Sequence, residues 1–228
     1  MNNRQELLSV IKSCTPEQKQ EIFLAIRDSI LIHDLERKFQ VRAEVILEAI
    51  ARSNDITQRG VRGLIAELVF VMDILPTVKS WQSDPPIGDV AYDACLVNGD
   101  CRVRIQVKMQ RRVKGAPMIR AGSHVVEVQR TRTGTKNGSA TRPYRFGEFD
   151  LLAVSMQAST GSWTSFMYAA ATALTPKTAR PDEIDTFQLI PAIGDNGVWT
   201  NDLLTALDRA SEGAAPKLRR EQSRVIGT

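Results

Sequence analysis

The chain is short of the residues from which structural metal sites and disulfide frameworks are built. Its 228 residues include three cysteines, Cys14, Cys95 and Cys101, and two histidines, His33 and His124. The cysteines form no CxxC pair and have no histidine nearby in the sequence, so a structural zinc site is not expected. An odd number of cysteines without a pairing pattern suits a reducing compartment, which predicts a cytoplasmic protein.

Long apolar runs and nucleotide-binding loops are missing as well. No apolar run approaches the roughly 20 residues that span a bilayer, and the N-terminal residues lack the pattern of a signal peptide. There is no P-loop and no Gly-rich cofactor motif, so neither a motor domain nor a methyltransferase domain is expected. With 43% apolar and 25% charged residues, the chain has the composition of a folded protein with no membrane segment.

The net charge of +4 hides an uneven distribution of charged residues along the chain. Between Arg102 and Arg145 the sequence has twelve Lys or Arg residues and one acidic residue, Glu127, a net charge of +11. The remaining residues therefore carry −7, which is +4 minus +11. A block this basic is typical of a surface that binds a polyanion, although a solvated basic face has the same composition.

The first quarter of the chain has the pattern of helices. Thr15, Pro16 and Glu17 form a helix start, with threonine as the N-cap and proline at the first helical position. No glycine occurs before Gly60, and no strand-like alternation is present. We therefore predict an N-terminal helical region over residues 1–55, which serves in DNA contact, in dimerisation or only as scaffold.

The next helical segment is apolar nearly all round. Its pattern predicts a helix from about Val61 to Leu75 that is buried against the rest of the domain. Glu67 lies in the middle of this helix, where a carboxylate costs free energy unless it is paired, hydrogen-bonded or bound to a metal. A structural ion pair with an arginine and a place in a metal site are both open for Glu67.

The chain becomes β-rich after the turn-rich segment QSDPPIGD. Alternation and turn residues predict strands over 90–97, 101–110, 124–130, 149–156, 163–169 and 186–191. A helix follows near 202–210, and residues 213–228 form a polar tail. The predicted fold class is α/β (α+β), a mixed β-sheet core over 56–212 that is flanked by helices.

An Asn-Gly pair at 98–99 predicts a β-hairpin. With a two-residue turn there, opposed residues have numbers that sum to about 197, so Asp93 faces Arg104 and lies diagonal to Gln106. The second strand alternates apolar and polar residues, which puts Asp93, Gln106 and Lys108 on one polar face. A turn one residue longer would change this parity.

These side chains suit the hydrolysis of a phosphodiester bond. That reaction uses a hard cation to neutralise developing charge, and Mg²⁺ prefers oxygen ligands. We predict as metal ligands the Asp93 carboxylate, the Gln106 side-chain oxygen, the Val107 backbone carbonyl and Glu67. Lys108 is predicted to orient the attacking water and to stabilise the transition-state charge. The predicted catalytic residues are Asp93, Gln106, Lys108 and Glu67.

The same residues resemble the PD-(D/E)XK nuclease superfamily. Over about residues 63–154 the chain has the family's order of a helix with Glu67, a hairpin with Asp93 and a strand with Lys108. The sequence IQVKMQ departs from the family pattern because Gln106 stands where the family has Glu or Asp, a variant that occurs among its restriction and homing endonucleases. The resemblance implies a restriction-endonuclease-like core, and Asp89 in GDVAYD is the alternative to Asp93 as the metal ligand.

The resemblance and the basic block together predict double-stranded DNA as the partner. They imply a Mg²⁺-dependent endodeoxyribonuclease similar to type II restriction enzymes, a homodimer, and a cognate DNA methyltransferase that acts on the same site. Gln129 and Arg130 are predicted to read bases, and the loop over 131–145 to contact both phosphates and bases. The full set of predicted DNA-binding residues is Arg111, Arg112, Lys114, Gln129, Arg130, Arg132, Lys136, Asn137, Arg142 and Arg145.

Two other functions are compatible with these sequence features. One is a homing or repair nuclease of the same superfamily. The other is a non-catalytic DNA-binding protein, in which the N-terminal helices contact DNA and the β-rich core is only scaffold. Metal-dependent cutting of plasmid DNA distinguishes this second alternative from a nuclease.

Overall fold

The computed structural model describes residues 3–27, 30, 33–130, 135–136, 139–140, 142–192 and 194–212. The chain divides into two compact units, Met1–Gln58 and Arg59–Thr228. The division into 1–55, 56–212 and 213–228 stays a prediction, and the polar tail over 213–228 lies outside the described residues. None of the helices in the described part of the chain is long and apolar enough to span a membrane.

The first unit contains the helices that the sequence pattern predicts. They are α1 (Asn3–Ser13), α2 (Pro16–Arg27), α3 (Asp34–Phe39) and α4 (Ala43–Ala51). The predicted cap of α2 is present, since the Gln18 backbone nitrogen donates to Thr15 Oγ1 at 3.3 Å and the Thr15 nitrogen donates to Gln18 Oε1 at 2.9 Å. This reciprocal pair stabilises the first turn of α2.

Polar contacts rather than an apolar core connect α2, α3 and α4. Arg27 Nε donates to Glu44 Oε1 at 2.7 Å, and the same guanidinium pairs with Glu36. Among the described residues of this unit, only Ala43 is a buried apolar residue. Large apolar side chains are exposed on these helices, namely Leu7, Leu8, Val10, Phe23, Leu24, Ile26, Leu35, Phe39, Val41, Val45 and Leu47. The unit therefore presents extensive apolar surface.

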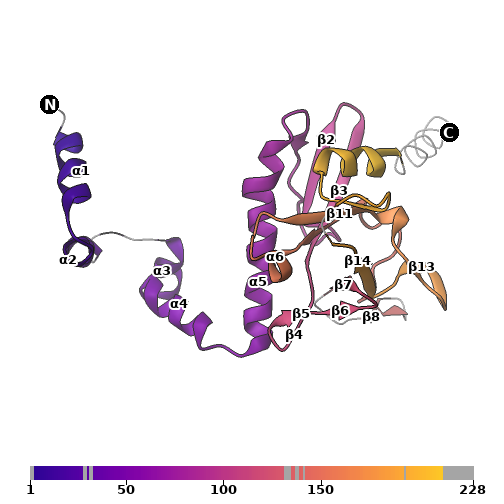
Figure 1. The fold of residues 1–228 in the computed structure, drawn as a ribbon, viewed down its shortest axis with the longest axis horizontal. Helices are drawn as coiled ribbons and strands as arrows, with labels where there is room; N and C mark the ends of the chain where they lie inside the picture. The colour runs from indigo at the N-terminus through magenta and orange to yellow at the C-terminus, as the bar shows by residue number, and fades with distance from the viewer. Residues whose placement is uncertain are drawn as a thin grey trace. The chain divides into compact units, whose positions relative to one another are not determined.

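The second unit is built on a mixed six-stranded sheet (Figure 1). Its strand order is β1 (Gln82–Ser83), β2 (Ala94–Asn98), β3 (Cys101–Met109), β10 (Leu151–Ser155), β11 (Phe166–Ala170) and β15 (Trp199–Thr200). The strands β3 and β10 are parallel, and the other neighbouring pairs are antiparallel. The predicted mixed α/β fold is thus confirmed.

Helices and small sheets surround this central sheet. A three-stranded sheet has the order β14 (Phe187–Ile190), β7 (Ser123–Glu127) and β6 (Ile119–Arg120). The remaining strands form two-stranded pairs: β4 (Arg112–Val113) with β5 (Ala116–Pro117), β8 (Thr135–Lys136) with β9 (Ser139–Ala140), and β12 (Pro176–Lys177) with β13 (Arg180–Ile184). The helical elements are α5 (Asp55–Val69), the π-helical η1 (Phe70–Ile74), the 3-10 turns η2 (Leu75–Thr77) and η3 (Ala171–Ala173), α6 (Gln157–Thr160) and a helix over 203–212.

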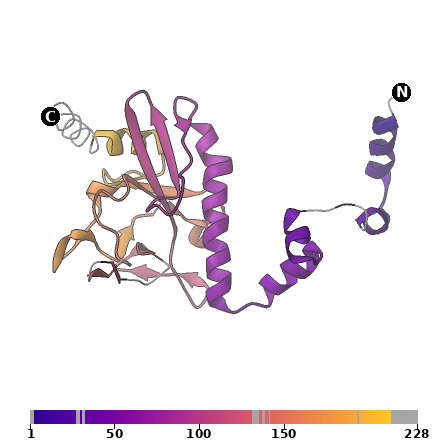
Figure 2. The same ribbon diagram turned by 180° about the vertical axis from the view of Figure 1, so that it is seen from behind.

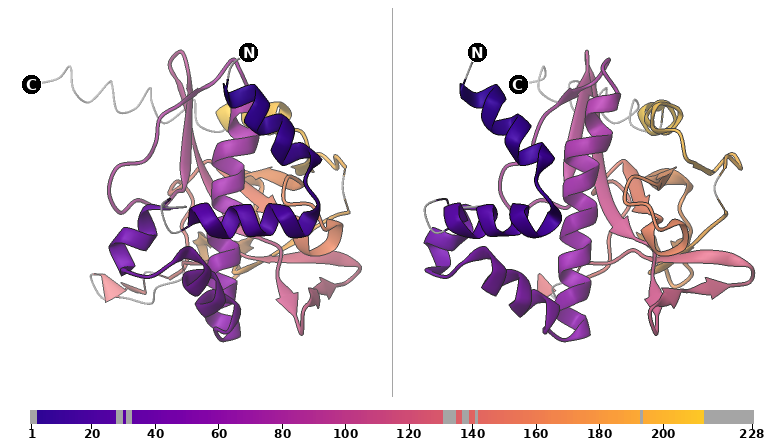
Figure 3. Two further views of the ribbon diagram at one scale, coloured as in Figure 1. Left: turned by 90° about the vertical axis from the view of Figure 1, so that its left-hand side faces the viewer. Right: turned by 60° about the vertical axis from the view of Figure 1, so that its left-hand side comes forward.

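Both faces of the central sheet are buried. On one face Val103, Ile105 and Val107 pack with Phe70 of η1 and with residues of the helix over 203–212. Figures 2 and 3 show α5 running alongside the β2–β3 hairpin. On the other face the alternate residues of β10 and β11 pack against residues of β7, including Val126. A sheet covered on both sides exposes little of its surface to water, so polar residues of β3 can be buried as well.

The apolar helix predicted from about Val61 to Leu75 corresponds to α5 and η1, and it is buried on one side only. Ala66 and Phe70 are fully buried, but Leu64, Leu68 and Met72 are 60%, 55% and 68% exposed. The exposed residues recur every four positions and so lie on one side of the helix. A helix packed on a sheet contacts it through one side only, and the apolar residues on its other side remain uncovered in this chain.

Several predicted strand limits shift in the structure. The first hairpin strand begins at Ala94 instead of residue 90, because residues 84–92 form an irregular connection. The predicted strand over 124–130 ends at Glu127. The connection between β10 and β11 contains the one-turn helix α6.

Candidate active site

The hairpin predicted around residues 98–99 is present, with its turn one residue later. Asn98 pairs with Cys101, so the two-residue turn is Gly99-Asp100. Gly99 has a φ of 57°, a left-handed conformation that glycine adopts at little cost. The numbers of paired residues therefore sum to 199 instead of the predicted 197. Because this difference is even, the parity of the two faces is as predicted.

The corrected register moves Asp93 away from Arg104 and next to Gln106. The Asp93 backbone nitrogen donates to the Ile105 carbonyl at 2.9 Å, which extends the hairpin pairing beyond β2. Arg104 has another partner, since its Nε and Nη2 each bond the carboxylate of Asp150 at 2.8 Å. The predicted pairing of Asp93 with Arg104 is therefore wrong, and Asp93 is free of that guanidinium.

Asp93 is held by the strand that carries the other predicted site residues. Its Oδ2 accepts a hydrogen bond from the Val107 backbone nitrogen at 2.8 Å and another from Gln106 Nε2. The Gln106 amide nitrogen also lies 3.2 Å from the Val107 carbonyl oxygen. Only 2% of Gln106 is exposed. Asp89, the alternative acid, is exposed instead. Two hydrogen bonds therefore hold the Asp93 carboxylate in one orientation beside β3.

Glu67, Asp93 and Lys108 act on one another electrostatically. Burial raises the pKa of Asp93, while the Lys108 charge and the two hydrogen bonds to its carboxylate lower that pKa. Burial is the main cause that raises the pKa of Glu67, and the negative charge of Asp93 raises it further. The positive charge of Lys108 lowers the pKa of Glu67. Burial lowers the pKa of Lys108, and both carboxylates raise it. The fold thus brings a helical Glu, a hairpin Asp and a strand Lys into one partly desolvated cluster.

The donor atoms in this cluster fit a hard cation. The oxygen atoms of the two carboxylates and of the Val107 carbonyl are of the kind that Mg²⁺ takes as ligands, while Gln106 presents its amide nitrogen to Asp93 and to that carbonyl. The negative charge of Asp93 raises the pKa of Glu67, and a divalent cation bound beside both carboxylates would relieve this repulsion. Across the described residues no three His, Cys, Asp or Glu side chains gather closely enough to form a metal site by themselves.

The basic residues that follow Lys108 are largely bonded within the protein. Arg111 forms an ion pair with Glu127, and the Gln129 amide bonds the same carboxylate. Arg112 donates to Gln157 of α6. Such a residue can contact DNA only if it gives up its bond within the protein. The DNA contacts of these residues therefore stay predictions.

Three other predicted DNA-binding residues are exposed. Lys114 lies in the turn between β4 and β5 with a φ of 51°, and Arg142 and Arg145 lie between β9 and β10. Arg145 is near Asp182, with an Nε to Oδ2 distance of 3.9 Å. Arg132 and Asn137 lie outside the described residues, as does the side chain of Lys136 in β8.

Tyr144 lies beside Lys108, a contact that the sequence pattern does not predict. Lys108 Nζ lies 5.4 Å from the centroid of the Tyr144 ring, and Arg130 Cζ lies 5.1 Å from it. Arg130 also forms an ion pair with Glu148 at 2.7 Å. Tyr144 is 4% exposed, so it does not stack on bases as an exposed aromatic residue does. Tyr144 lies 36 positions after Lys108, so no helix or strand periodicity in the sequence predicts their contact.

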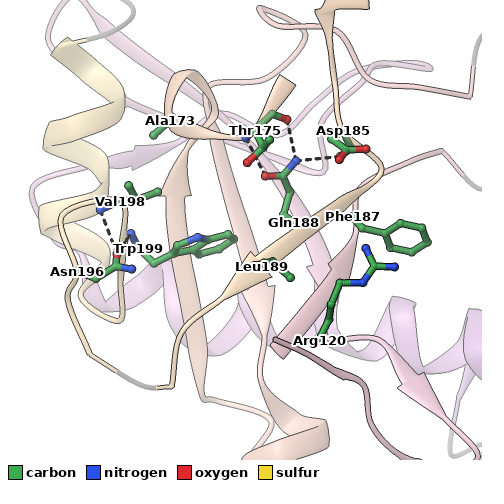
Figure 4. Close-up of a pocket in the computed structure, with 10 residues that line it drawn as sticks. All are labelled: Arg120, Ala173, Thr175, Asp185, Phe187, Gln188, Leu189, Asn196, Val198 and Trp199. Carbon is green, nitrogen blue, oxygen red and sulfur yellow. Dashed lines mark hydrogen bonds between the residues drawn. The ribbon is translucent and has the colours of Figure 1, made fainter. Parts of the chain in front are cut away.

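A pocket of about 420 Å³ lies away from this cluster, against β14 and β15 (Figure 4). Its wall includes Gln188, whose amide bonds the backbone of Thr175 and Asp185. Arg120 at its rim places Cζ 5.5 Å from the ring centroid of Phe187. The pocket contains none of the predicted catalytic residues. The pocket is therefore separate from the candidate active site at Asp93 and Lys108.

Comparison with solved structures finds a likeness at low sequence identity. The chain matches the solved structure of a bacterial homing endonuclease, I-Ssp6803I, with 15% sequence identity and a TM-score of 0.37. The match covers 74% of this chain and 97% of that chain. No protein-family model matches the chain. No curated protein matches it.

Substitution of Gln106 tests whether its side chain is a metal ligand. We expect Gln106→Glu to keep cleavage activity and to need less Mg²⁺, because a carboxylate is a stronger ligand than an amide oxygen. Gln106→Leu, which puts an apolar group beside Asp93, should slow cleavage by about 100-fold or more. Single-turnover rates across a Mg²⁺ titration measure both effects. Equal rates for the two variants would show that Gln106 is no ligand.

Proposed function

We propose that the chain is a Mg²⁺-dependent endodeoxyribonuclease that hydrolyses phosphodiester bonds in both strands of double-stranded DNA at a specific site, as type II restriction enzymes do. The observation that carries this proposal is the cluster of Glu67, Asp93 and Lys108 beside Gln106. These side chains come from a helix, a hairpin and a strand, and their charges affect one another. The order and the chemistry both match the nuclease superfamily that the sequence resembles.

Each residue of the cluster has a distinct task in this proposal. Asp93 and Glu67 hold the cation together with the Gln106 side chain and the Val107 carbonyl. Bound Mg²⁺ supplies charge neutralisation at the phosphate oxygens. Lys108 donates a hydrogen bond to the attacking water or to the phosphate, and its burial strengthens that interaction by excluding bulk solvent. The hydrogen bonds from Gln106 and Val107 keep Asp93 oriented before DNA binds.

A homodimer is part of the proposal because one site per chain must act on two antiparallel strands. The apolar residues exposed on the helices of the first unit support it, since apolar surface of this extent in a protein favours association. Site-specific cutting also requires that the host's DNA be protected, which is why we propose a cognate DNA methyltransferase. Light scattering coupled to size exclusion measures the assembly directly.

Because the recognition sequence is unknown, the proposed activity is tested on DNA long enough to contain all short recognition sequences. Genomic DNA and supercoiled plasmids are incubated with the protein in Mg²⁺, in Ca²⁺ and in EDTA. We expect discrete fragments in Mg²⁺ and binding without cutting in Ca²⁺. Lys108→Ala is the matched control against a contaminating nuclease. Binding without cutting in Mg²⁺ and in Mn²⁺ would instead identify a non-catalytic DNA-binding protein.

The exposed basic residues should contribute affinity without sequence preference. We expect Lys114→Ala and Arg142→Ala to weaken binding on every sequence and to lower the slope of log affinity against log salt by about one unit per lost phosphate contact. Gln129→Ala should instead relax discrimination between single-base variants of the site, by about 1–3 kcal/mol. Binding in Ca²⁺ at several salt concentrations separates the two effects. A uniform loss for all three variants would leave base reading to other residues.

A further inference from the structure

The ammonium of Lys108 sits on a flexible four-carbon side chain, so its position needs other groups to hold it. Burial alone does not fix the side chain, because several rotamers remain available to a buried lysine. The Tyr144 ring lies 5.4 Å from Lys108 Nζ. This distance falls within the roughly 6 Å at which a cation is attracted to the face of an aromatic ring.

The Tyr144 ring is itself immobile. Its centroid lies 5.4 Å from that of Phe149 in an edge-to-face arrangement with an interplanar angle of 88°. The Tyr144 backbone carbonyl accepts a hydrogen bond from the Ile184 nitrogen at 2.9 Å. The ring also belongs to the apolar cluster that covers one face of the central sheet. A ring fixed by packing and by its backbone provides a rigid surface for the ammonium.

Arg130 adds a directional effect. Its Cζ lies 5.1 Å from the same ring centroid, and its ion pair with Glu148 fixes the guanidinium there. The positive charge of Arg130 repels the ammonium of Lys108, whereas Asp93 and Glu67 attract it. The ring and these charges together favour the Lys108 conformations in which the ammonium lies toward the two carboxylates.

We propose that Tyr144 is a positioning residue that holds the Lys108 ammonium where the two carboxylates attract it, with Arg130 fixed on the same ring. The inference rests on the proposed nuclease function and adds to it a residue that does not touch DNA or metal. Tyr144 acts through its ring, so its hydroxyl is dispensable. Arg130 then has a role inside the protein in place of the base reading predicted from the sequence.

The rate test compares substitutions at Tyr144. Tyr144→Leu removes the ring and should lower the single-turnover cleavage rate by about tenfold, a barrier change of about 1.4 kcal/mol, with DNA affinity in Ca²⁺ unchanged. Tyr144→Phe keeps the ring and should stay within about threefold of the wild type. Tyr168→Leu is the matched control, since Tyr168 is buried on the other face of the sheet. If Tyr144→Leu does not fold, Tyr144→Met serves for the same comparison.

A second measurement needs no DNA. The ring current of Tyr144 should shift the NMR signals of the Lys108 side chain upfield in the wild type and in Tyr144→Phe, and Tyr144→Leu should remove that shift. An unchanged Lys108 signal, or equal slowing by Tyr168→Leu and Tyr144→Leu, overturns the positioning role while the nuclease function stands. A wild-type protein that shows the shift but cuts no DNA overturns the proposed function, and the positioning role in cleavage fails with it.

Discussion

Lys108→Ala is expected to slow the chemical step of DNA cleavage by about 10²–10⁴-fold, the range that a positioned proton-transfer or charge-stabilising group contributes. The side chain is largely desolvated and both carboxylates act on it, so alanine removes the positive charge that they attract. DNA affinity in Ca²⁺ should change by less than about threefold, because a single buried lysine contributes little to the binding of a long polyanion. Single-turnover rates at saturating enzyme measure the step directly.

Lys79→Ala provides the control for the loss of one positive charge. Lys79 is exposed in the same unit, so its removal changes the net charge without touching the cluster. We expect this variant to cut at the wild-type rate. If Lys108→Ala cuts as fast as Lys79→Ala, the polar face of β3 has no part in the chemistry, and the proposed mechanism is wrong.

Asp93→Asn is expected to abolish cleavage and, without divalent metal, to raise the melting temperature at pH 8 by at least about 2 °C. Burial raises the pKa of Asp93, so the folded state binds a proton more tightly than the unfolded state. The contribution of this carboxyl to stability is therefore fully present below its unfolded pKa and is lost as the pH rises through its folded pKa. Asparagine stays neutral at pH 8, and the gain should shrink as the pH falls toward 4.

Added Mg²⁺ should reverse the order of stability. If the folded wild type binds Mg²⁺ as proposed, the cation should raise its melting temperature by mass action, whereas Asp93→Asn lacks a proposed ligand and should gain little. Asp150→Asn is the matched control, because its carboxylate is paired with Arg104 and its loss should lower the melting temperature at pH 8. An Asp93→Asn variant that is less stable than the wild type in metal-free buffer at pH 8, or that gains as much from Mg²⁺, would contradict the proposed metal site.

Local patterns in the sequence were sufficient to predict much of the candidate site. The hairpin follows from a glycine turn, and the shared face of Asp93, Gln106 and Lys108 follows from the two-residue period of strands. The turn moved by one residue, yet the faces stayed the same because the register changed by an even number. Glu67 was predicted from one carboxylate within an apolar helix. These features depend on a residue's neighbours along the chain, which the sequence displays.

The partners of these residues were decided by the tertiary structure. Arg104 pairs with Asp150, 46 positions away, and not with the Asp93 that the hairpin alone suggested. Tyr144 reaches Lys108 from a distant segment. No periodicity encodes such contacts, because they depend on which elements pack together after the chain folds.

The sequence by itself determined the α/β class, the hairpin and the side of each strand on which its residues lie, since all three follow from local geometry. Only the tertiary structure decided how much of each side of a strand or helix is exposed to solvent. Gln106 is buried on the polar side of β3, where the paired residue Leu152 of β10 belongs to the second apolar core. One side of α5 remains exposed, because no described residue of its unit covers that side. Burial is a property of the assembled layers, and periodicity identifies only the sides that are available to be buried.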